Sequence, residues 1–253
     1  MLKNKTILVA GAGGLLGTRL VFSLVEQGAS VIATDVDLQG MMARFEKKLP
    51  GKGMEKISGV QLDLNDSAQV KLFFSTVKGL DGAVNCAYPR NKKYGTAFFA
   101  VELEDFNENV SLHLGASFLF MQQCAAYFQK ERTLFSLVNI SSVYGIMAPR
   151  FEVYDDTPMT MPVEYAAIKS AVLQLSKYLT RYVSSSQFRS NCVSPGGIFD
   201  NQPEVFVEKY RKHCLGKGML DIVDVMGAII FLLSDESRYL NGQNLVVDDG
   251  FSL

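Results

Sequence analysis

Hydrophobic and polar residues follow two periods along this chain, and the two alternate almost to its end. Short runs of apolar and β-branched residues indicate strands, and the central runs are almost continuously apolar, as is typical of buried parallel strands. Between them, apolar positions recur about every 3.6 residues, which predicts helices. Strands are predicted at residues 6–10, 30–34, 57–62, 82–85, 134–140, 189–193 and 244–247. Helices are predicted at residues 14–27, 38–49, 67–78, 104–130, 162–183 and 222–233.

This alternation predicts an α/β fold, a doubly wound parallel sheet of about seven strands with helices on both faces. No internal repeat, low-complexity tract or linker rich in proline and serine divides the chain. We therefore expect a single domain over residues 1–253. Residues 150–162 and 201–219 fit neither period, and we expect them to be irregular, mobile insertions.

Composition narrows the possible classes of function. Hydrophobic residues make up 48% and charged residues 20% of the 253 residues, which is typical of a folded globular protein. The net charge of −1 argues against a nucleic acid or an anionic membrane as partner. Residues 228–233, the longest apolar stretch, fall far below the roughly 20 residues of a membrane-spanning helix. The apolar run at residues 7–10 is too short for a signal peptide, so we expect a cytoplasmic protein.

Cysteine and histidine are too few and too scattered to suggest a metal site. The chain has four cysteines without a C-x-x-C pair, and only two histidines. We expect reduced thiols and no metal. Acid–base chemistry is expected to come mainly from side chains other than histidine.

A glycine-rich turn follows the first predicted strand. Gly11, Gly14 and Gly17 have the spacing G-x-x-G-x-x-G, and Leu16 stands where the commoner G-x-G-x-x-G pattern has its last glycine. Such a turn lets a pyrophosphate approach the backbone at the positive end of the following helix. The sequence therefore predicts a dinucleotide site. The alternative is that the glycines only allow the strand and the helix to pack closely at this turn.

Two aspartates follow the second and third predicted strands. Asp35 is placed to accept hydrogen bonds from both hydroxyls of an adenosine ribose, and its charge would repel a 2′-phosphate. No basic residue follows at Val36 or Asp37, so NAD is favoured over NADP. Asp63 is placed to reach the adenine amino group. For both aspartates the alternative is a turn or helix cap.

The predicted helix 162–183 carries a pair of residues suited to proton transfer. Tyr165 and Lys169 are four residues apart and share one face. A nearby ammonium favours the phenolate and brings the tyrosine pKa toward working range. Ser142 follows a strand at the carboxyl edge of the sheet, where it is placed to hold a substrate oxygen. Residues 195–198 turn away from another strand end, beside the expected nicotinamide carboxamide.

Together, these motifs resemble the short-chain dehydrogenase/reductase family along essentially the whole chain, which implies a Rossmann-type NAD(P)-binding fold. The resemblance implies that Tyr165 is the general acid/base, that Lys169 tunes its pKa and anchors the nicotinamide ribose, and that Ser142 binds the substrate oxygen. It implies that Asn109 holds a proton-relay water. The implied cofactor contacts are Gly11, Gly14, Leu16, Gly17, Asp35, Asp63, Leu64, Asn85, Ala87, Tyr165, Lys169, Pro195, Gly196 and Ile198.

Departures from the usual family pattern suggest a subgroup. The N-N-A-G motif is replaced by Asn85-Cys86-Ala87-Tyr88, and Asp200 stands where a threonine is common. The segment between Ser142 and Tyr165 is longer than in the short branch and is similar to the extended branch, which handles nucleotide sugars. This combination of short-branch and extended-branch features resembles the flagellin-modification protein A group of oxidoreductases, which act in bacterial surface-sugar pathways.

A basic and aromatic loop follows the fourth predicted strand. It contains Tyr88, Arg90 and Lys93, and Arg150 from the first insertion is expected to join it. A sugar-like and possibly anionic small-molecule substrate would suit this lining. The alternative is a solvated surface loop.

The sequence therefore predicts an NAD-dependent oxidoreductase that transfers hydride between nicotinamide and a carbinol or carbonyl carbon. Two alternatives are a nucleotide-sugar epimerase or dehydratase that recycles NAD internally, and a cofactor-binding scaffold without activity. The predicted helices 104–130 and 162–183 carry more apolar residues than packing on the sheet needs. We therefore expect a homodimer or homotetramer, as the resemblance also implies.

Overall fold

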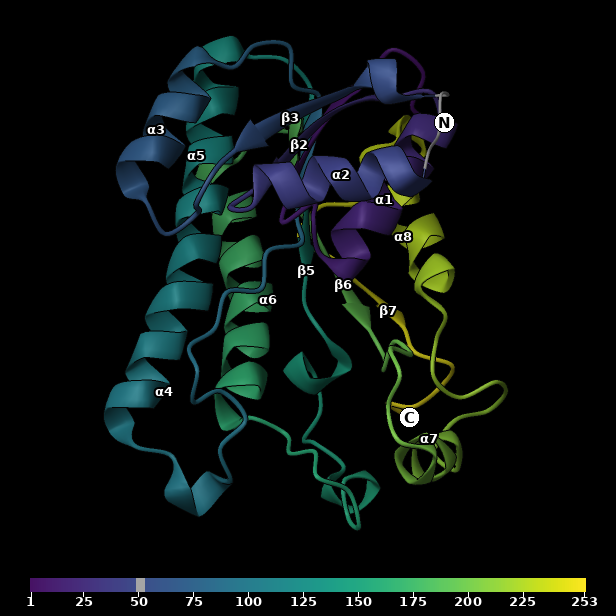
Figure 1. The fold of residues 1–253 in the computed structure, drawn as a ribbon. Coiled ribbons are helices and arrows are strands. Elements are labelled where there is room, and N and C mark those ends of the chain that lie inside the picture. The colour runs from purple at the N-terminus through teal and green to yellow at the C-terminus, as the bar shows by residue number, and fades with distance from the viewer. Residues whose placement is uncertain (49–52) are drawn as a thin grey trace.

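The computed structural model describes residues 1–48 and 53–253 and has the predicted fold class (Figure 1). One sheet of seven strands has the order β3-β2-β1-β4-β5-β6-β7, and its described pairings are all parallel. Each pairing therefore needs a crossover connection, which the helices supply. The strands are β1 (Thr6–Ala10), β2 (Ser30–Asp35), β3 (Ile57–Gln61), β4 (Gly82–Asn85), β5 (Phe135–Ile140), β6 (Phe188–Pro195) and β7 (Asn244–Val247).

Helices cover both faces of this sheet. On one face are α1 (Leu15–Glu26), α2 (Leu38–Lys48) and α8 (Met226–Leu233). On the other are α3 (Ser67–Thr76), α5 (Ala116–Glu131) and α6 (Val163–Val183). Two shorter helices, α4 (Leu103–Asn109) and α7 (Glu204–Arg211), lie beyond the carboxyl ends of the strands, at the bottom of Figure 1.

Several predicted elements differ from the observed ones. The helix expected over 104–130 consists of α4, a π-helical segment Val110–Gly115, and α5. The second insertion is not wholly irregular, because it contains α7. The helix expected from residue 222 begins as a 3₁₀ turn, Ile222–Val225, before α8. Residue 49, the predicted end of the second helix, lies outside the described residues.

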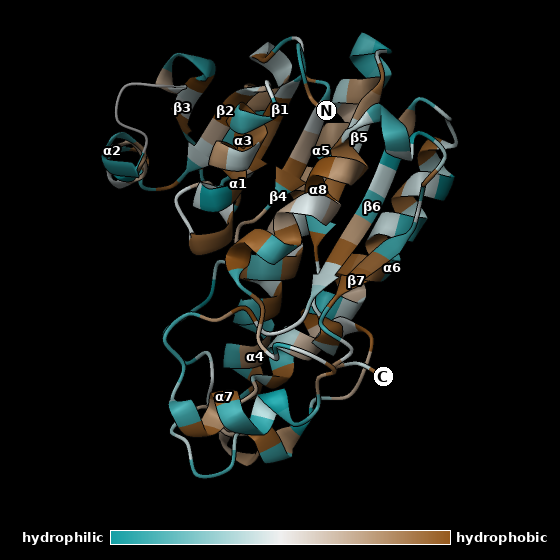
Figure 2. Cartoon of the chain, turned by 90° about the vertical axis from the view of Figure 1, so that its right-hand side faces the viewer, coloured by the Kyte–Doolittle hydropathy of each residue, from teal (hydrophilic) through white to brown (hydrophobic). Residues whose placement is uncertain are grey.

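The core has three parts. Two apolar clusters fill the two faces of the sheet, and in Figure 2 the apolar colour runs along the strands and α8. A third cluster lies beyond the carboxyl edge of the sheet and joins segments that are distant in sequence. Its buried members are Val143, Tyr144, Val153, Phe206, Tyr210, Met219 and Phe251.

The apolar residues expected to form a subunit interface lie mostly in the second cluster. Phe120, Met121, Ala125, Phe128 and Val172 are all buried there, because α5 packs against both α3 and α6 as well as the sheet. Most of the apolar residues that seemed more than the sheet needs are therefore buried within one chain.

Candidate active site

The turn between β1 and α1 consists of glycines partly because larger residues do not fit. A Cβ on Gly11, whose φ is +70°, would lie 2.6 Å from the backbone of Ala87, and a Cβ on Gly17 would lie 2.2 Å from the carbonyl oxygen of Gly11. Packing explains these two glycines. Gly14 is different, because it begins α1 with no side-chain cap. The first N–H groups of the helix therefore have no side-chain partner at the cap, beside partly buried Leu16, and this helix start fits a pyrophosphate.

Asp35 lies beside this turn at the end of β2. Its Oδ2 accepts a hydrogen bond from Gly13 N at 2.9 Å, and its Oδ1 accepts one from Asp37 N at 3.1 Å. The residue that caps α2 is Asp37, whose Oδ1 accepts from Gly40 N at 2.9 Å. Asp35 therefore does not cap α2, although its bond to Asp37 N is a local turn of the kind that the alternative predicted. Its contact with a ribose stays a prediction.

Asp63 holds a local turn, because its Oδ1 accepts a hydrogen bond from Asn65 N at 2.8 Å. The cap of α3 is Asp66, which accepts from Ala68 N and Gln69 N. Leu64 is buried in the second core cluster. Asn85 is buried at the end of β4, where its Oδ1 accepts from Ala87 N at 3.1 Å and shapes the turn that packs on Gly11.

Sequence reasoning missed a basic residue beside Asp35. A Cβ on Gly13 would lie 2.7 Å from Arg44 Nη2 and 2.9 Å from Asp35 Oδ2, so the guanidinium and the carboxylate face the same place. Arg44 belongs to α2 rather than to the end of β2. The residues directly after β2, Val36 and Asp37, give no sign of Arg44, because its position beside Asp35 depends on how α2 packs on the sheet.

The side chains predicted to transfer a proton or bind the substrate oxygen lie together where β5 ends. Ser142 begins the 3₁₀ turn Val143–Gly145, and its Oγ accepts a hydrogen bond from Tyr144 N at 3.2 Å. Ser141 Oγ donates to the carbonyl oxygen of Lys169 at 2.8 Å. A Cβ on Gly145 would lie 2.8 Å from the carbonyl carbon of Lys169, so glycine lets α6 lie directly on this turn. The turn thus brings Ser142 together with Tyr165 and Lys169.

Burial dominates the electrostatics of this group. Lys169 is 6% exposed, and its Nζ donates to the carbonyl oxygen of Ile140 at 2.9 Å. Burial lowers the pKa of Lys169 to about 8. Burial also raises the pKa of Tyr165, and a hydrogen bond with Ser142 lowers it in part. The expected lowering by Lys169 is not found in this arrangement, because Nζ is bonded to Ile140 and lies 5.6 Å from the centre of the Tyr165 ring.

Asn109 is buried at the end of α4, and its amide is engaged within the protein. Its Nδ2 donates to Glu164 Oε1 at 3.0 Å and to Asn91 Oδ1 at 3.1 Å, and its Oδ1 accepts from Asn91 N at 2.9 Å. Asn109 therefore ties the loop after β4 to the start of α6. Among the described residues, it makes no hydrogen bond with Tyr165 or Lys169.

The loop after β4 places an aromatic ring beside Tyr165 and Lys169. The Tyr88 ring lies edge-on to the Tyr165 ring, with centres 5.8 Å apart, and Lys169 Nζ lies 5.6 Å from its centre. The Tyr88 and Tyr94 hydroxyls are hydrogen-bonded to each other. The guanidinium of Arg90 lies 5.0 Å from the Tyr88 ring. Tyr88 therefore lies beside Tyr165 and Lys169, and Arg90 lies beside Tyr88, while contact of either residue with a substrate stays a prediction.

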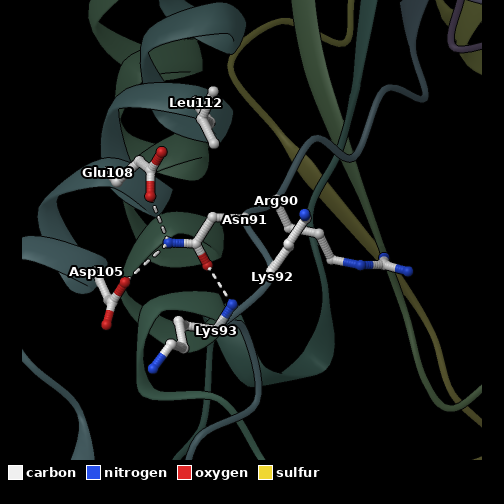
Figure 3. A pocket seen from close by; sticks show the side chains of 7 residues that line it. All are labelled: Arg90, Asn91, Lys92, Lys93, Asp105, Glu108 and Leu112. Carbon is white, nitrogen blue, oxygen red and sulfur yellow. Dashed lines mark hydrogen bonds between the residues drawn. The ribbon is translucent and has the colours of Figure 1, made fainter.

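A pocket of about 440 Å³ adjoins this loop (Figure 3). Asn91 spans it by donating to Glu108 Oε2 at 2.7 Å and to Asp105 Oδ1 at 3.4 Å. The lining has both charges, because two carboxylates stand opposite the basic residues of the loop. Its residues are Arg90, Asn91, Lys92, Lys93, Asp105, Glu108 and Leu112.

Arg150 does not join this loop. Its Nη2 donates to the carbonyl oxygens of Phe251 at 3.2 Å and Leu253 at 3.1 Å, and its guanidinium lies 5.4 Å from the Phe251 ring. The arginine thus fastens the first insertion to the C-terminal segment. The sequence-based expectation was wrong in this respect, because the partners are backbone carbonyls 101 and 103 residues away in the chain.

The turn after β6 is held by α7. Gly197 N donates to Tyr210 Oη at 2.6 Å, and Gly196 N donates to the carbonyl oxygen of Val247 at 2.8 Å. A Cβ on Gly196 would lie 2.9 Å from the same tyrosine hydroxyl. Pro195 ends β6, and Ile198 forms a bridge with Leu220. These contacts fix the backbone expected to face a carboxamide.

Three further observations concern the described parts of the chain. None of their helices combines the length and apolar character needed to cross a membrane. In the same residues, no group of three or more histidine, cysteine, aspartate or glutamate side chains is placed to hold a metal ion. Cys86, Cys124, Cys192 and Cys214 are all free thiols.

Comparison with known proteins agrees with this geometry. Residues 14–252 match the family model described as enoyl-(acyl carrier protein) reductase. The chain is 36% identical over 258 residues to the post-translational flagellin modification protein A of Campylobacter coli, covering 100% of both. It is 28% identical over 256 residues to a 3-oxoacyl-(acyl-carrier-protein) reductase of Thermotoga maritima, covering 98% of both.

A solved structure has the same fold. The short-chain dehydrogenase of Leptospira borgpetersenii with bound NAD⁺ matches with a TM-score of 0.87 and 28% identity, over 100% of this chain and 94% of that one. The glycine turn, the acidic strand end and the Ser142–Tyr165–Lys169 group are thus found in a chain that matches this family along its length. The chain belongs to the short-chain dehydrogenase/reductase family and is an NAD(P)-dependent oxidoreductase.

Proposed function

We propose that this enzyme uses NAD to interconvert a carbinol and a carbonyl group on a sugar derivative, as a step in making a bacterial surface glycan. The observation that carries the proposal is the meeting of Ser142, Tyr165 and Lys169 at the carboxyl edge of the sheet, next to the glycine turn. The cofactor supplies or accepts the hydride. The protein has to bind the substrate oxygen and move its proton.

Each catalytic side chain has a distinct task in this proposal. The Ser142 hydroxyl binds the substrate oxygen and keeps it next to Tyr165 Oη. In the reducing direction Tyr165 gives its proton to that oxygen, and in the oxidising direction it takes the proton away. Its raised pKa keeps the phenol protonated at neutral pH, which suits the donor role. The Lys169 ammonium restores the proton that Tyr165 loses.

The preference for NAD rests on Asp35. Its carboxylate beside Gly13 favours the two hydroxyls of an unmodified ribose and repels a 2′-phosphate. Arg44 faces the same place and attracts a phosphate, so it weakens the discrimination without reversing it. We therefore expect NADH to bind more tightly than NADPH, by a smaller factor than Asp35 alone would give.

The sugar substrate is inferred from two observations. The Campylobacter coli relative is named for post-translational flagellin modification and matches this chain from end to end. The pocket beside Tyr88 offers Arg90, Lys92 and Lys93 to an anionic group. Its carboxylates, Asp105 and Glu108, suit the hydroxyl groups or an amine of the same ligand.

We also propose that the enzyme is a cytoplasmic homodimer or homotetramer. Phe118 on α5 is 49% exposed, and Tyr178 and Tyr182 on α6 are 64% and 71% exposed. The two tyrosine rings stack on each other, with centres 6.1 Å apart. Exposed aromatic residues of this kind are enriched in subunit interfaces. Light scattering at micromolar concentration tests the assembly, and a monomer would contradict it.

Reduction of NAD⁺ with hexoses, hexose phosphates and nucleotide sugars tests the activity, followed at 340 nm. Tyr165→Phe keeps the ring but removes the exchangeable proton, so turnover should fall at least about 100-fold while NADH affinity changes little. Ser142→Ala should lower turnover with the cofactor still bound. An unchanged rate in Tyr165→Phe would refute the mechanism. Product formed without net NADH would indicate an epimerase or dehydratase instead.

A further inference from the structure

Lys169 is a buried ammonium that, among the described residues, forms no ion pair with a carboxylate. The residue is 6% exposed, and one of its N–H groups donates to the carbonyl oxygen of Ile140 at 2.9 Å. A buried charge is costly unless neighbouring groups compensate for the water that it has lost. A single carbonyl oxygen is little compensation for an ammonium with three donors.

Two aromatic rings adjoin this ammonium. Lys169 Nζ lies over the ring of Tyr165 and over the ring of Tyr88, 5.6 Å from the centre of each. A cation within about 6 Å of a ring centre is attracted by the negative face of the ring, most strongly where water is excluded. The two rings stand at 86° to each other, with centres 5.8 Å apart, so they cover the ammonium from two directions.

Of these two rings, Tyr88 is the one that is particular to this chain. The N-N-A-G motif of the family ends in glycine, and Tyr88 stands at that position here. A glycine has no ring to offer a cation. Tyr165 is needed for proton transfer whether or not it touches Lys169, whereas Tyr88 takes no part in the transfer itself. Its contact with Lys169 therefore asks for a separate explanation.

The Tyr88 ring is held in place by its neighbours. Its hydroxyl is hydrogen-bonded to the hydroxyl of Tyr94 on the same loop. The imidazole of His113, from the π-helical segment Val110–Gly115, packs edge-on to the ring, with centres 5.0 Å apart. The guanidinium of Arg90 lies over the ring, 5.0 Å from its centre. Because these contacts fix the ring, it is preorganised to receive a cation.

We propose that Tyr88 is a positioning residue, whose ring keeps the Lys169 ammonium charged and next to Tyr165 through a cation–π contact. This inference rests on the proposed function, in which a charged Lys169 serves Tyr165. The ring acts without exchanging a proton of its own, because burial raises the pKa of the Tyr88 phenol and keeps it neutral. The charged groups that act on Tyr88 are Arg90 on its own loop and Glu164 on α6.

The other titratable groups around Lys169 stay neutral while it titrates. Burial lowers the pKa of Lys169 to about 8. Burial raises the pKa of Cys86, after β4, to about 12 and that of Cys192, on β6, to about 11. It also raises the pKa of Tyr165 and lowers that of His113 to about 2. The titration of Lys169 is therefore separate from those of its neighbours.

The first test follows the charge of Lys169 without substrate or cofactor. In protein labelled with ¹³C at lysine Cε, NMR gives a titration for each lysine, and the signal that is missing in Lys169→Met belongs to Lys169. Its midpoint should lie near pH 8, well below the usual lysine value of 10.5. Tyr88→Leu stays apolar but removes the ring, so the midpoint should fall by about 0.5–1 pH unit. Tyr88→Phe keeps the ring and should leave the midpoint within about 0.2 pH units of wild type.

A second series changes the electrostatics of the ring and very little of its shape. Phenylalanine and phenylalanines that carry one, two or three ring fluorines are incorporated at position 88. Each fluorine withdraws electron density from the ring face and weakens the attraction for a cation. The Lys169 midpoint should therefore fall stepwise with the number of fluorines. A ring that is only a packing element predicts no such trend, and the series remains informative if Tyr88→Leu does not fold.

Tyr127→Leu is the matched control, because it also removes a buried tyrosine ring. Tyr127 lies at the opposite end of the strands, where its hydroxyl accepts a hydrogen bond from Leu80 N at 2.8 Å. This control should leave the Lys169 midpoint unchanged. An unchanged or higher midpoint in Tyr88→Leu, an equal fall in Tyr88→Phe, or a fluorine series without a trend would overturn the proposal.

Kinetics separate this inference from the proposed function. With NAD⁺ and the sugar of the panel that is oxidised fastest, one step of the kcat/KM profile against pH should match the NMR midpoint of Lys169. Tyr88→Leu should move that step to lower pH by the same amount as the NMR midpoint. If no sugar is oxidised, the proposed function fails, and the NMR titrations still decide the role of Tyr88. If sugars are oxidised while the Lys169 midpoint is indifferent to Tyr88, the function stands and the role of Tyr88 is refuted.

Discussion

Replacing Lys169 by methionine should separate what this residue does for catalysis from what it does to stability. The ammonium is buried in wild type and makes one hydrogen bond, to the carbonyl oxygen of Ile140. Lowering a lysine pKa from 10.5 to about 8 corresponds to a cost of about 3 kcal/mol in the free energy of folding. Removing the hydrogen bond forfeits about 1–2 kcal/mol. At pH 7, Lys169→Met should therefore be more stable than wild type by about 1–2 kcal/mol, although inactive.

The sign of the pH dependence follows from the two protonation states. Below pH 8 the lysine is charged in both folded and unfolded chains, so the full burial cost is present. Between pH 8 and 10.5 only the unfolded chain binds the proton, and wild-type stability therefore rises with pH relative to the variant. Above this window both states are neutral, the cost is gone, and the missing hydrogen bond should make the variant the less stable protein.

Urea unfolding of both proteins at pH 7, 9 and 10 measures this difference. Effects of other titrating groups cancel when the two chains are compared at the same pH. Lys71→Met on α3 is the matched control, because its side chain is exposed and should give a small difference that does not change with pH. A Lys169→Met variant that is less stable than wild type at pH 7, by an amount independent of pH, would refute the reasoning.

Three further predictions concern the cofactor end and the C-terminal segment. Fluorescence titration should show that Asp35→Ala narrows the gap between NADH and NADPH affinity and that Arg44→Ala widens it. The free energy of unfolding in urea should fall by at least about 3 kcal/mol in Gly17→Ala, where the Cβ meets backbone, and should stay or rise in Gly227→Ala, where nothing lies within 4 Å. Arg150→Ala should cost about 1–3 kcal/mol, since it frees two C-terminal carbonyls.

Local pattern was enough for the sheet and for much of the site. The strand ends were predicted to within two residues, and the predicted fold class is confirmed. Both could be predicted because alternating and β-branched residues form a pattern among neighbours in sequence. Ser142, Tyr165 and Lys169 were predicted to lie close together for a similar reason, while their roles stay a prediction. Two of them share a helix face and the third ends a strand, so the topology alone brings them to one edge of the sheet.

The contacts that were missed depend on how elements pack. Arg44 reaches Gly13 only because α2 lies across the glycine turn, and Arg150 finds its partners at the C-terminal end. The helix α7 was overlooked in a segment judged irregular, although Phe206 and Tyr210, spaced one turn apart, are the residues that it buries.

The third core cluster makes the substrate end a cooperative unit of its own. Tyr210 stacks on Phe251, with ring centres 4.0 Å apart, and Phe206 packs on Tyr154, so α7, the first insertion and the C-terminal segment share aromatic contacts. Segments joined in this way tend to open together as a foldon, at lower free energy than the sheet. In native-state hydrogen exchange their amides should therefore exchange in one step while β1 and β4 stay protected, so that access to the active site follows a sub-global unfolding equilibrium rather than separate loop movements.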